Sequence, residues 1–350
     1  MLEAVGIGDL HLDGKLATSI ADFNRVVTDE VRIVLEKARM HGVRVVFLYG
    51  DVCERSRLSQ NAEGHLLQLF HDYSEMQFII WKGNHDAEGP GPLEPTSLDT
   101  FYRLAQLKYV PNIRVVLHEP SEFFTSTDHP IRVLPWPYKE TKKGYLNLLH
   151  LECAGSKWET GREVSSTWST KHLCASGHLH TAQQVGSMYF SGTLYQTTFG
   201  EDPDKFFHRI RWTGDQATSK IQLVRHLPKY LLRNAVVRSL EEYETLVAEV
   251  KAAPKTTLWK VFVQSNKVLL PVNAFDGLDT IIKTNPFNTN KELAALIQDD
   301  LVLDDNSAQA AQNTDEMLRL WFQRNQIGDD MVERATRKMT ELRERGLHKA

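Results

Sequence analysis

The segment Ala4-Val5-Gly6-Ile7-Gly8-Asp9-Leu10-His11 joins a short apolar run to a glycine turn that carries an aspartate and a histidine. A helical pattern follows over residues 19–41, where apolar side chains recur at the spacing of one helix face. Residues 43–50 then form a second apolar run, which is followed by Asp51. The order of strand, helix and strand predicts an α/β fold.

Four further apolar runs continue this pattern, over residues 77–83, 131–136, 146–150 and 172–177. Several of them contain few polar residues, as is typical of strands that are buried on both faces. We therefore predict an α/β sandwich for residues 1–228.

The composition indicates a soluble globular protein with more than one domain. The 350 residues are 41% hydrophobic and 25% charged, and no apolar stretch reaches the roughly 18 residues of a membrane-spanning helix. The apolar run at residues 2–7 is cut by Asp9, which argues against a secretory signal. Three cysteines are too few for a disulfide framework, so we expect the reducing cytoplasm. The net charge of −4 neither requires nor excludes a nucleic-acid partner.

The sequence pattern changes near Pro228, which suggests a domain boundary. Residues 229–298 contain apolar runs on either side of a glutamate-rich helical segment and predict a small α/β module. Residues 299–313 are acidic or small and polar, as expected for a linker. Residues 314–350 have a helical pattern and predict a C-terminal helical tail.

Five short polar blocks stand at the ends of predicted strands. They are Gly8-Asp9-Leu10-His11, Gly50-Asp51-Val52, Gly83-Asn84-His85-Asp86, His150 and Gly177-His178-Leu179-His180. In open α/β sheets, ligands bind in the crevice beyond the carboxyl ends of the strands. We therefore expect the five blocks to converge at one site.

The residue types in these blocks are those of a metal site. The candidate ligands are Asp9, His11, Asp51, Asn84, His150, His178 and His180. Carboxylates, imidazoles and an amide oxygen suit Mn²⁺, Fe or Zn²⁺, and the absence of thiolates argues against a purely structural zinc site. Seven ligands are too many for one ion with an open position, so two ions that share a bridging carboxylate are expected. His150 has an alternative interpretation as a core histidine, because it stands alone after an apolar run.

In this order, the blocks resemble the motifs of the calcineurin-like metallophosphoesterases. Together with Leu134-Pro135-Trp136 and Ser191-Gly192-Thr193, they are similar to SbcD-type nuclease subunits of DNA double-strand-break repair complexes, and compact phage recombination nucleases are nearest. The motifs cover about residues 1–200. The resemblance implies a four-layer sandwich of two mixed β-sheets flanked by helices, a DNA-capping domain at 229–298 and a partner-binding tail at 314–350.

The resemblance also implies a role for each site residue. One ion would be held by Asp9, His11, Asp51 and His180, and the other by Asp51, Asn84, His150 and His178. His85 would support the transition-state charge or protonate the leaving oxygen, and Asp86 would orient His85. Glu54 stands where some relatives have a second histidine, which leaves the role of this position open.

The implied activity is a 3′-to-5′ exonuclease on duplex DNA and an endonuclease on single strands and hairpins. Mn²⁺ is the expected metal, with Mg²⁺, Fe and Zn²⁺ as alternatives. The chain has no Gly-x-x-x-x-Gly-Lys-Ser/Thr phosphate loop, so an SbcC-like coiled-coil ATPase is the expected partner of a homodimer. The expected compartment is the cytoplasm of a bacterial or phage-infected cell.

Two groups of lysines are candidates for contacts with DNA. Lys139, Lys142 and Lys143 follow a proline-rich turn whose aromatic residues, Trp136 and Tyr138, could stack on bases or simply pack. Residues 229–291 carry three more basic than acidic residues, and this excess includes Lys255, Lys260 and Lys267. The alternative is a solvated small domain whose lysines bind nothing specific.

The tail contains apolar residues at helical spacing, and those expected to bind the ATPase are Leu320, Trp321, Met331, Met339 and Leu342. The alternative is that these residues pack on the tail's own domain. For the whole chain, the alternatives to a nuclease are a stand-alone phosphoesterase for small phosphodiesters or phosphoproteins, and a scaffold without catalytic activity.

Overall fold

The computed structural model describes residues 1–89, 91, 94–124, 129–263, 275, 277–278 and 280–284. The chain divides into two compact units, of which the first is Met1–Arg233 with Thr256–Leu258 and the second begins at Asn234. The predicted linker and tail, together with Lys267, Leu320, Trp321, Met331, Met339 and Leu342, lie outside the described residues.

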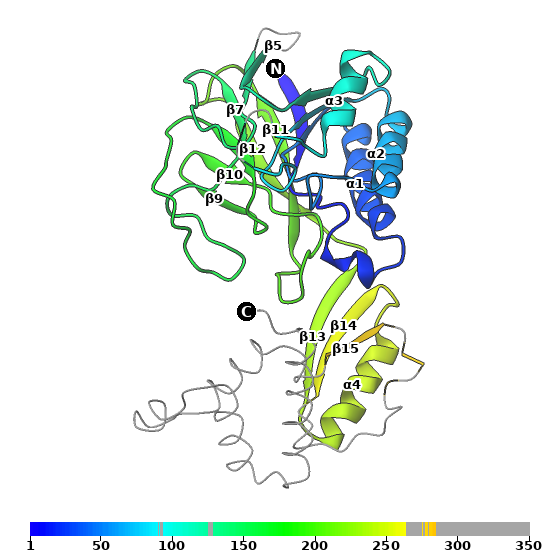
Figure 1. The fold of residues 1–350 in the computed structure, drawn as a ribbon. Helices are drawn as coiled ribbons and strands as arrows, with labels where there is room; N and C mark the ends of the chain where they lie inside the picture. Colours follow the sequence, from blue (N-terminus) through cyan, green and yellow to red (C-terminus); the bar gives the residue numbers. More distant parts are fainter. Residues whose placement is uncertain are drawn as a thin grey trace, which may run out of the picture. The chain divides into compact units, whose positions relative to one another are not determined.

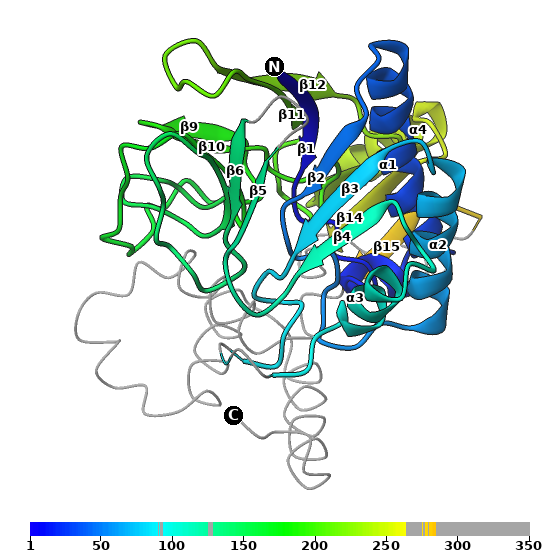
Figure 2. The same ribbon diagram turned by 90° about the horizontal axis from the view of Figure 1, so that it is seen from above.

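The first unit contains a six-stranded sheet in the order β12-β11-β1-β2-β3-β4 (Figure 2). Its parallel strands are β1 (Leu2–Ile7), β2 (Val45–Leu48), β3 (Gln77–Trp81) and β4 (Ile113–Val116). Strands β11 (Lys205–Trp212) and β12 (Lys220–His226) extend the sheet beside β1 in antiparallel pairs. The sheet is therefore mixed.

Helices connect the parallel strands and lie along one face of this sheet (Figures 1 and 2). They are the short 3₁₀ helix η1 (Lys15–Thr18), α1 (Phe23–Met40), α2 (Gln60–Asp72) and α3 (Asp99–Gln106). Helix α1 buries an apolar stripe that includes Val27, Val31 and Val34, as its sequence periodicity predicts. Ser59 caps α2 by accepting a hydrogen bond from the backbone N–H of Ala62 at 3.1 Å.

A second six-stranded sheet has the order β5-β6-β7-β8-β10-β9. Its strands are β5 (Ser121–Phe124), β6 (Pro130–Val133), β7 (Leu146–His150), β8 (Cys174–Gly177), β9 (Gln183–Val185) and β10 (Met188–Phe190). Strands β6, β7, β8 and β10 run parallel, and the two edge strands pair antiparallel.

One buried apolar cluster contains side chains of both sheets. Phe47, Trp81 and Trp212 of the first sheet share it with Leu146 and Leu148 of the second. The two mixed sheets therefore pack on a common core, and the predicted α/β class with two mixed sheets is confirmed. Among the described residues, no helix is long and apolar enough to span a membrane.

The second unit has a three-stranded sheet in the order β13-β14-β15. Its elements are β13 (Leu231–Val237), which starts in the first unit, α4 (Leu240–Ala252), β14 (Thr257–Val263) and β15 (Ile281–Thr284). Ser239 caps α4 by accepting a hydrogen bond from Glu242 N–H. Trp259, Val261 and Leu246 contribute to its own apolar core.

Candidate metal centre

Five strands of the first unit end at the polar blocks that were recognised in the sequence. Asp9, Asp51 and Asn84 follow the neighbouring parallel strands β1, β2 and β3. His150 ends β7, and His178 follows the adjacent strand β8. The carboxyl ends of strands from both sheets thus deliver their side chains to one place.

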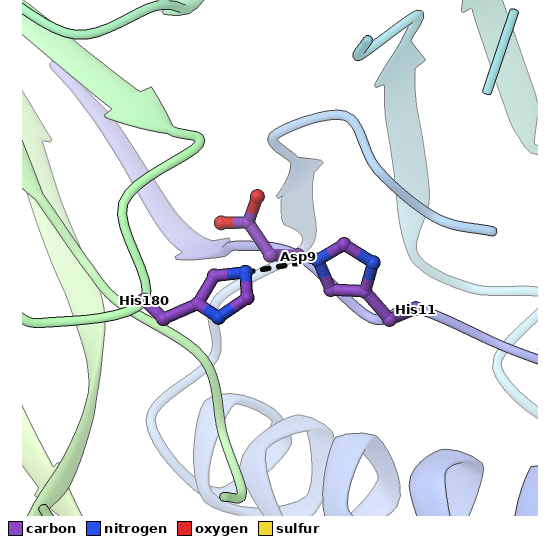
Figure 3. A group of neighbouring side chains, drawn as sticks. All are labelled: Asp9, His11 and His180. Atoms are coloured by element: carbon purple, nitrogen blue, oxygen red, sulfur yellow. Dashed lines mark hydrogen bonds between the residues drawn. The ribbon is translucent and has the colours of Figure 1, made fainter. Parts of the chain in front are cut away.

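Asp9, His11 and His180 form the first group of side chains at this place (Figure 3). One donor atom of each lies within 4.8 Å of the donor atoms of the other two. The Nε2 atoms of His11 and His180 face each other at 3.0 Å, and the Asp9 carboxylate lies beside this pair. These three are among the four ligands predicted for one ion.

Asp51, His150 and His178 form the second group, also with donor atoms within 4.8 Å of one another. Oδ2 of Asp51 lies 3.1 Å from Nε2 of His150. Oδ1 of Asn84 lies 3.0 Å from the same nitrogen and 2.8 Å from Nδ1 of His178. All seven side chains predicted as ligands therefore gather in these two groups or beside them.

Two histidines have a carboxylate on the ring nitrogen that points away from the cluster. Nδ1 of His11 lies 2.9 Å from Oε2 of Glu54. Nε2 of His178 lies 3.0 Å from Oε2 of Glu152. A carboxylate that accepts the N–H of the far nitrogen leaves the near nitrogen as the one that can bind a metal ion.

The other two histidines follow the same rule. The backbone carbonyl of Tyr49 accepts a hydrogen bond from Nδ1 of His150 at 2.6 Å. Nδ1 of His180 lies 3.4 Å from Oε1 of Glu201, whose other oxygen pairs with the buried Lys205 at 2.8 Å. Imidazoles that bind metal ions in proteins are oriented by acceptors of this kind.

The two aspartates complete a donor set that fits a divalent cation. Asp9 and Asp51 are buried, with 1% and 2% of their surface exposed. One oxygen of each accepts a hydrogen bond from a backbone N–H at 2.8 Å. Asp9 accepts from His178, and Asp51 accepts from His85. Within the described chain, the buried Oδ2 of Asp9 has no hydrogen-bond partner. A buried carboxylate oxygen without a partner is costly, and a bound cation removes this cost.

The pKa values of the buried side chains also indicate that this site favours an added positive charge. Burial raises the pKa of Asp9, and the nearby Asp51 carboxylate raises it further. Burial would lower the pKa of His150, but the Asp51 and Asp9 carboxylates and the Tyr49 carbonyl together outweigh it and raise this pKa to about 9. A proton on His150 therefore compensates part of the carboxylate charge, which a metal ion would do in its place.

The backbone around the cluster is held in an unusual conformation. Asp9, His11, Asp51 and His178 have φ values of 48°, 45°, 45° and 82°, in the left-handed region that non-glycine residues seldom occupy. Such strain persists only where the surrounding structure imposes it, and it concentrates at functional sites. Gly83 permits the close approach, because a Cβ atom there would lie 2.2 Å from Oδ1 of Asp51.

His85 lies at the edge of the cluster, with its ring centroid 5.0 Å from that of His11. The prediction that Asp86 orients it does not agree with the contacts. Asp86 accepts hydrogen bonds from the backbone N–H groups of Cys53 and Gly83 at 3.0 and 2.9 Å and from Ser97 Oγ at 3.1 Å. Burial raises the pKa of Asp86 to about 6. Its hydrogen bonds connect the loops that follow β2 and β3. Nδ1 of His85 instead meets the backbone carbonyl of Glu54 at 3.2 Å.

Glu54 therefore has two contacts in the site, one through its carboxylate and one through its carbonyl. The sequence drew attention to this position without giving it a role. Glu152 stands two residues after His150, and that spacing is the signal that could have identified it. Glu201 gave no such signal, since it belongs to none of the five blocks and its burial depends on pairing with Lys205.

The lysines predicted to contact DNA have varied surroundings. Nζ of Lys142 lies 3.1 Å from Oε2 of Glu122 and 4.4 Å from the centroid of the Tyr145 ring, so its charge is partly compensated. Lys139, Lys143 and Lys255 are exposed, and Lys260 lies over the ring of Phe262. Contact with DNA remains a prediction for all of them.

Neither the scan of protein-family models nor the search of curated proteins gives a match to this chain.

Proposed function

We propose that the chain is a two-metal DNA phosphodiesterase, the nuclease subunit of an SbcCD-like repair and recombination complex. One observation carries the enzymatic part of this proposal. Each of four histidines has an acceptor on its far nitrogen, and their near nitrogens converge with two buried carboxylates and an amide oxygen. Imidazole nitrogens, carboxylate oxygens and an amide oxygen that meet in this way are the donor set of a divalent metal site.

The assignment of ligands follows the two groups of side chains. Asp9, His11 and His180 would hold one ion and Asn84, His150 and His178 the other, with Asp51 between them. Two divalent ions, when bound, would supply a water of lowered pKa and stabilise negative charge on the phosphate. Mn²⁺ is the metal that the resemblance favours.

The protein's own contribution to proton transfer would come from His85. Its Nδ1 faces the carbonyl of Glu54, which can only accept a hydrogen bond, so Nδ1 carries a proton. In the protonated ring, Nε2–H is then the donor for the leaving oxygen. The carbonyl of Glu54 thereby determines which ring nitrogen of His85 faces the leaving oxygen.

DNA as the substrate rests on the sequence resemblance. The same resemblance is the basis for the four-layer metallophosphoesterase fold, the capping role of residues 229–298 and the binding of an SbcC-like ATPase by residues 314–350. The two mixed sheets and the small α/β unit are compatible with this organisation.

Purified protein incubated with end-labelled duplex DNA tests the proposal directly. With Mn²⁺ the label should be released progressively, and a chelator should stop the release. A protein that hydrolyses a small chromogenic diester but leaves duplex and single-stranded DNA intact would instead be the stand-alone phosphoesterase.

A further inference from the structure

A cavity of about 140 Å³ adjoins the histidine cluster on the side of His85. His11, His85 and His180 belong to its lining. If the scissile phosphate lies between the candidate metal ligands and His85, as the proposed function requires, this cavity lies next to the phosphate. The group that fills it must then be a part of the substrate attached to that phosphate.

One part of the cavity lining is aromatic and rigid. The rings of Phe23 and Tyr195 pack edge to face, with their centroids 5.8 Å apart, and both side chains are buried. The hydroxyl of Tyr195 donates to the carbonyl of Leu10 at 2.7 Å, which fixes the ring. The two rings form an apolar wall, which suits a ring of the substrate better than a second charged group.

The remaining lining is polar and its charge argues against a second phosphate. Besides the histidines, the charged lining residues are the carboxylates of Glu54 and Glu159 and the ammonium of Lys15. Among these groups the carboxylates outnumber the ammonium, so they add no positive charge that would favour an additional anion. They would accept hydrogen bonds from the hydroxyl and N–H groups of a nucleoside.

Glu159 lies in a hairpin of residues 157–163, which several contacts hold in place. The side-chain amide of Gln183 accepts from the N–H of Lys157 at 2.9 Å and donates to its carbonyl at 2.7 Å. The N–H of Trp158 bonds the carbonyl of Arg162 at 2.9 Å, and the Trp158 ring meets the ring of His178 edge-on, with centroids 5.5 Å apart. The backbone next to Glu159 is therefore held in place.

We propose that this cavity is a subsite for the unpaired base of the nucleoside that is attached to the scissile phosphate. This inference rests on the proposed function and specifies its substrate. Sites for whole small molecules measure about 300–1,000 Å³, so a cavity of this size admits one ring system and excludes a base pair. A terminal base pair must therefore open before its phosphate reaches His85.

Two inhibitors of small-diester hydrolysis test this subsite in the full-length, manganese-loaded protein. Thymidine 5′-monophosphate carries the nucleoside, and inorganic phosphate lacks it. The nucleotide should inhibit at a concentration at least tenfold lower than phosphate. Glu159→Ala should reduce this ratio by on the order of tenfold, the share of a hydrogen bond to a charged group. Glu163→Ala, a residue of the same hairpin that does not line the cavity, should keep the wild-type ratio.

Equal inhibition of the wild type by the two compounds, or an unchanged ratio in Glu159→Ala, would overturn the subsite. Calorimetric titration of both compounds gives the same ratio without turnover. If the protein hydrolysed no phosphodiester, the proposed function would fail while the preference for the nucleotide could still be measured. On DNA, duplexes with an unpaired terminal thymidine should be degraded faster than fully paired ones, and equal rates would contradict the inference.

Discussion

Oδ2 of Asp51 lies 3.1 Å from Nε2 of His150, and both side chains are buried. The other oxygen of Asp51 accepts the backbone N–H of His85, so one carboxylate contacts a candidate ligand and the candidate proton donor. Burial would raise the pKa of Asp51, but the positive charge that His150 can carry lowers it. Asp51 is therefore the residue on which both halves of the proposed site depend.

Asp51→Asn should weaken Mn²⁺ binding by more than tenfold and reduce hydrolysis in parallel, because an amide cannot bridge two dications as a carboxylate does. Metal content and DNA cleavage would be measured on the same samples. Asp204→Asn, an equal change of charge at an exposed ion pair with Arg225, is the matched control. A fully metallated, active Asp51→Asn protein would exclude the bridging role.

His85→Ala should retain both ions and lose about 10²–10⁴-fold in hydrolysis, the usual share of a positioned proton donor. Nδ1 of His85 contacts the backbone carbonyl of Glu54, so this contact does not orient any of the seven candidate metal ligands. Metal content by mass spectrometry and turnover of duplex DNA would separate the two effects. Wild-type turnover in this variant would remove His85 from the mechanism.

Glu152→Ala should lower metal affinity by about 10–100-fold, the typical cost of removing an acceptor behind a ligating histidine. The carboxylate lies 3.0 Å from Nε2 of His178, and this hydrogen bond also lowers the pKa of Glu152. Nitrogen NMR of the metal-free protein should show a shift in the His178 tautomer. Glu163→Ala should change neither observable, and an equal loss of affinity in that control would point to a general charge effect.

His208 should make the first unit sensitive to acid. It is fully buried, its Nδ1 lies 3.0 Å from the Tyr49 hydroxyl, and burial lowers its pKa to about 3. The unfolded chain binds a proton at this histidine below about pH 6.5, whereas the folded chain does so only near pH 3. Above pH 6.5 neither state binds the proton, and the free energy of unfolding has its full value. It falls by about 1.4 kcal/mol per pH unit as the pH drops toward 3.

Denaturant unfolding of the metal-free protein between pH 7 and pH 5 would measure this loss. His208→Gln should flatten the dependence by the equivalent of one proton. His71→Gln, at an exposed position on α2, should keep the wild-type slope. An unchanged slope in His208→Gln would show that other groups control the acid sensitivity.

The sequence predicted the convergence of the five blocks because one rule of sheet geometry determines it. Residues that follow adjacent parallel strands must meet at one edge, and Asp9, Asp51 and Asn84 do so. The α/β class followed from the same alternation of runs and helical patterns. Strands β11 and β12 were not anticipated, because their antiparallel pairing beside β1 is a long-range choice that local periodicity does not encode.

The polar contacts behind the ligands could not be read from the sequence. Asp86 follows His85 directly, yet its carboxylate turns away from His85 and binds backbone N–H groups. Glu201 and Lys205 are both buried, whereas charged residues are normally exposed unless they are paired. Spacing along the chain gives the location of a side chain but not the direction in which its polar atoms point.

Native mass spectrometry of the chain with Mn²⁺ would count the metal ions that these residues bind. We predict two ions per chain in the wild type and none in a variant that carries Asp9→Asn and Asp51→Asn together. A wild-type chain that binds no ion, or a double variant that still binds two, would contradict a two-metal centre formed by these residues.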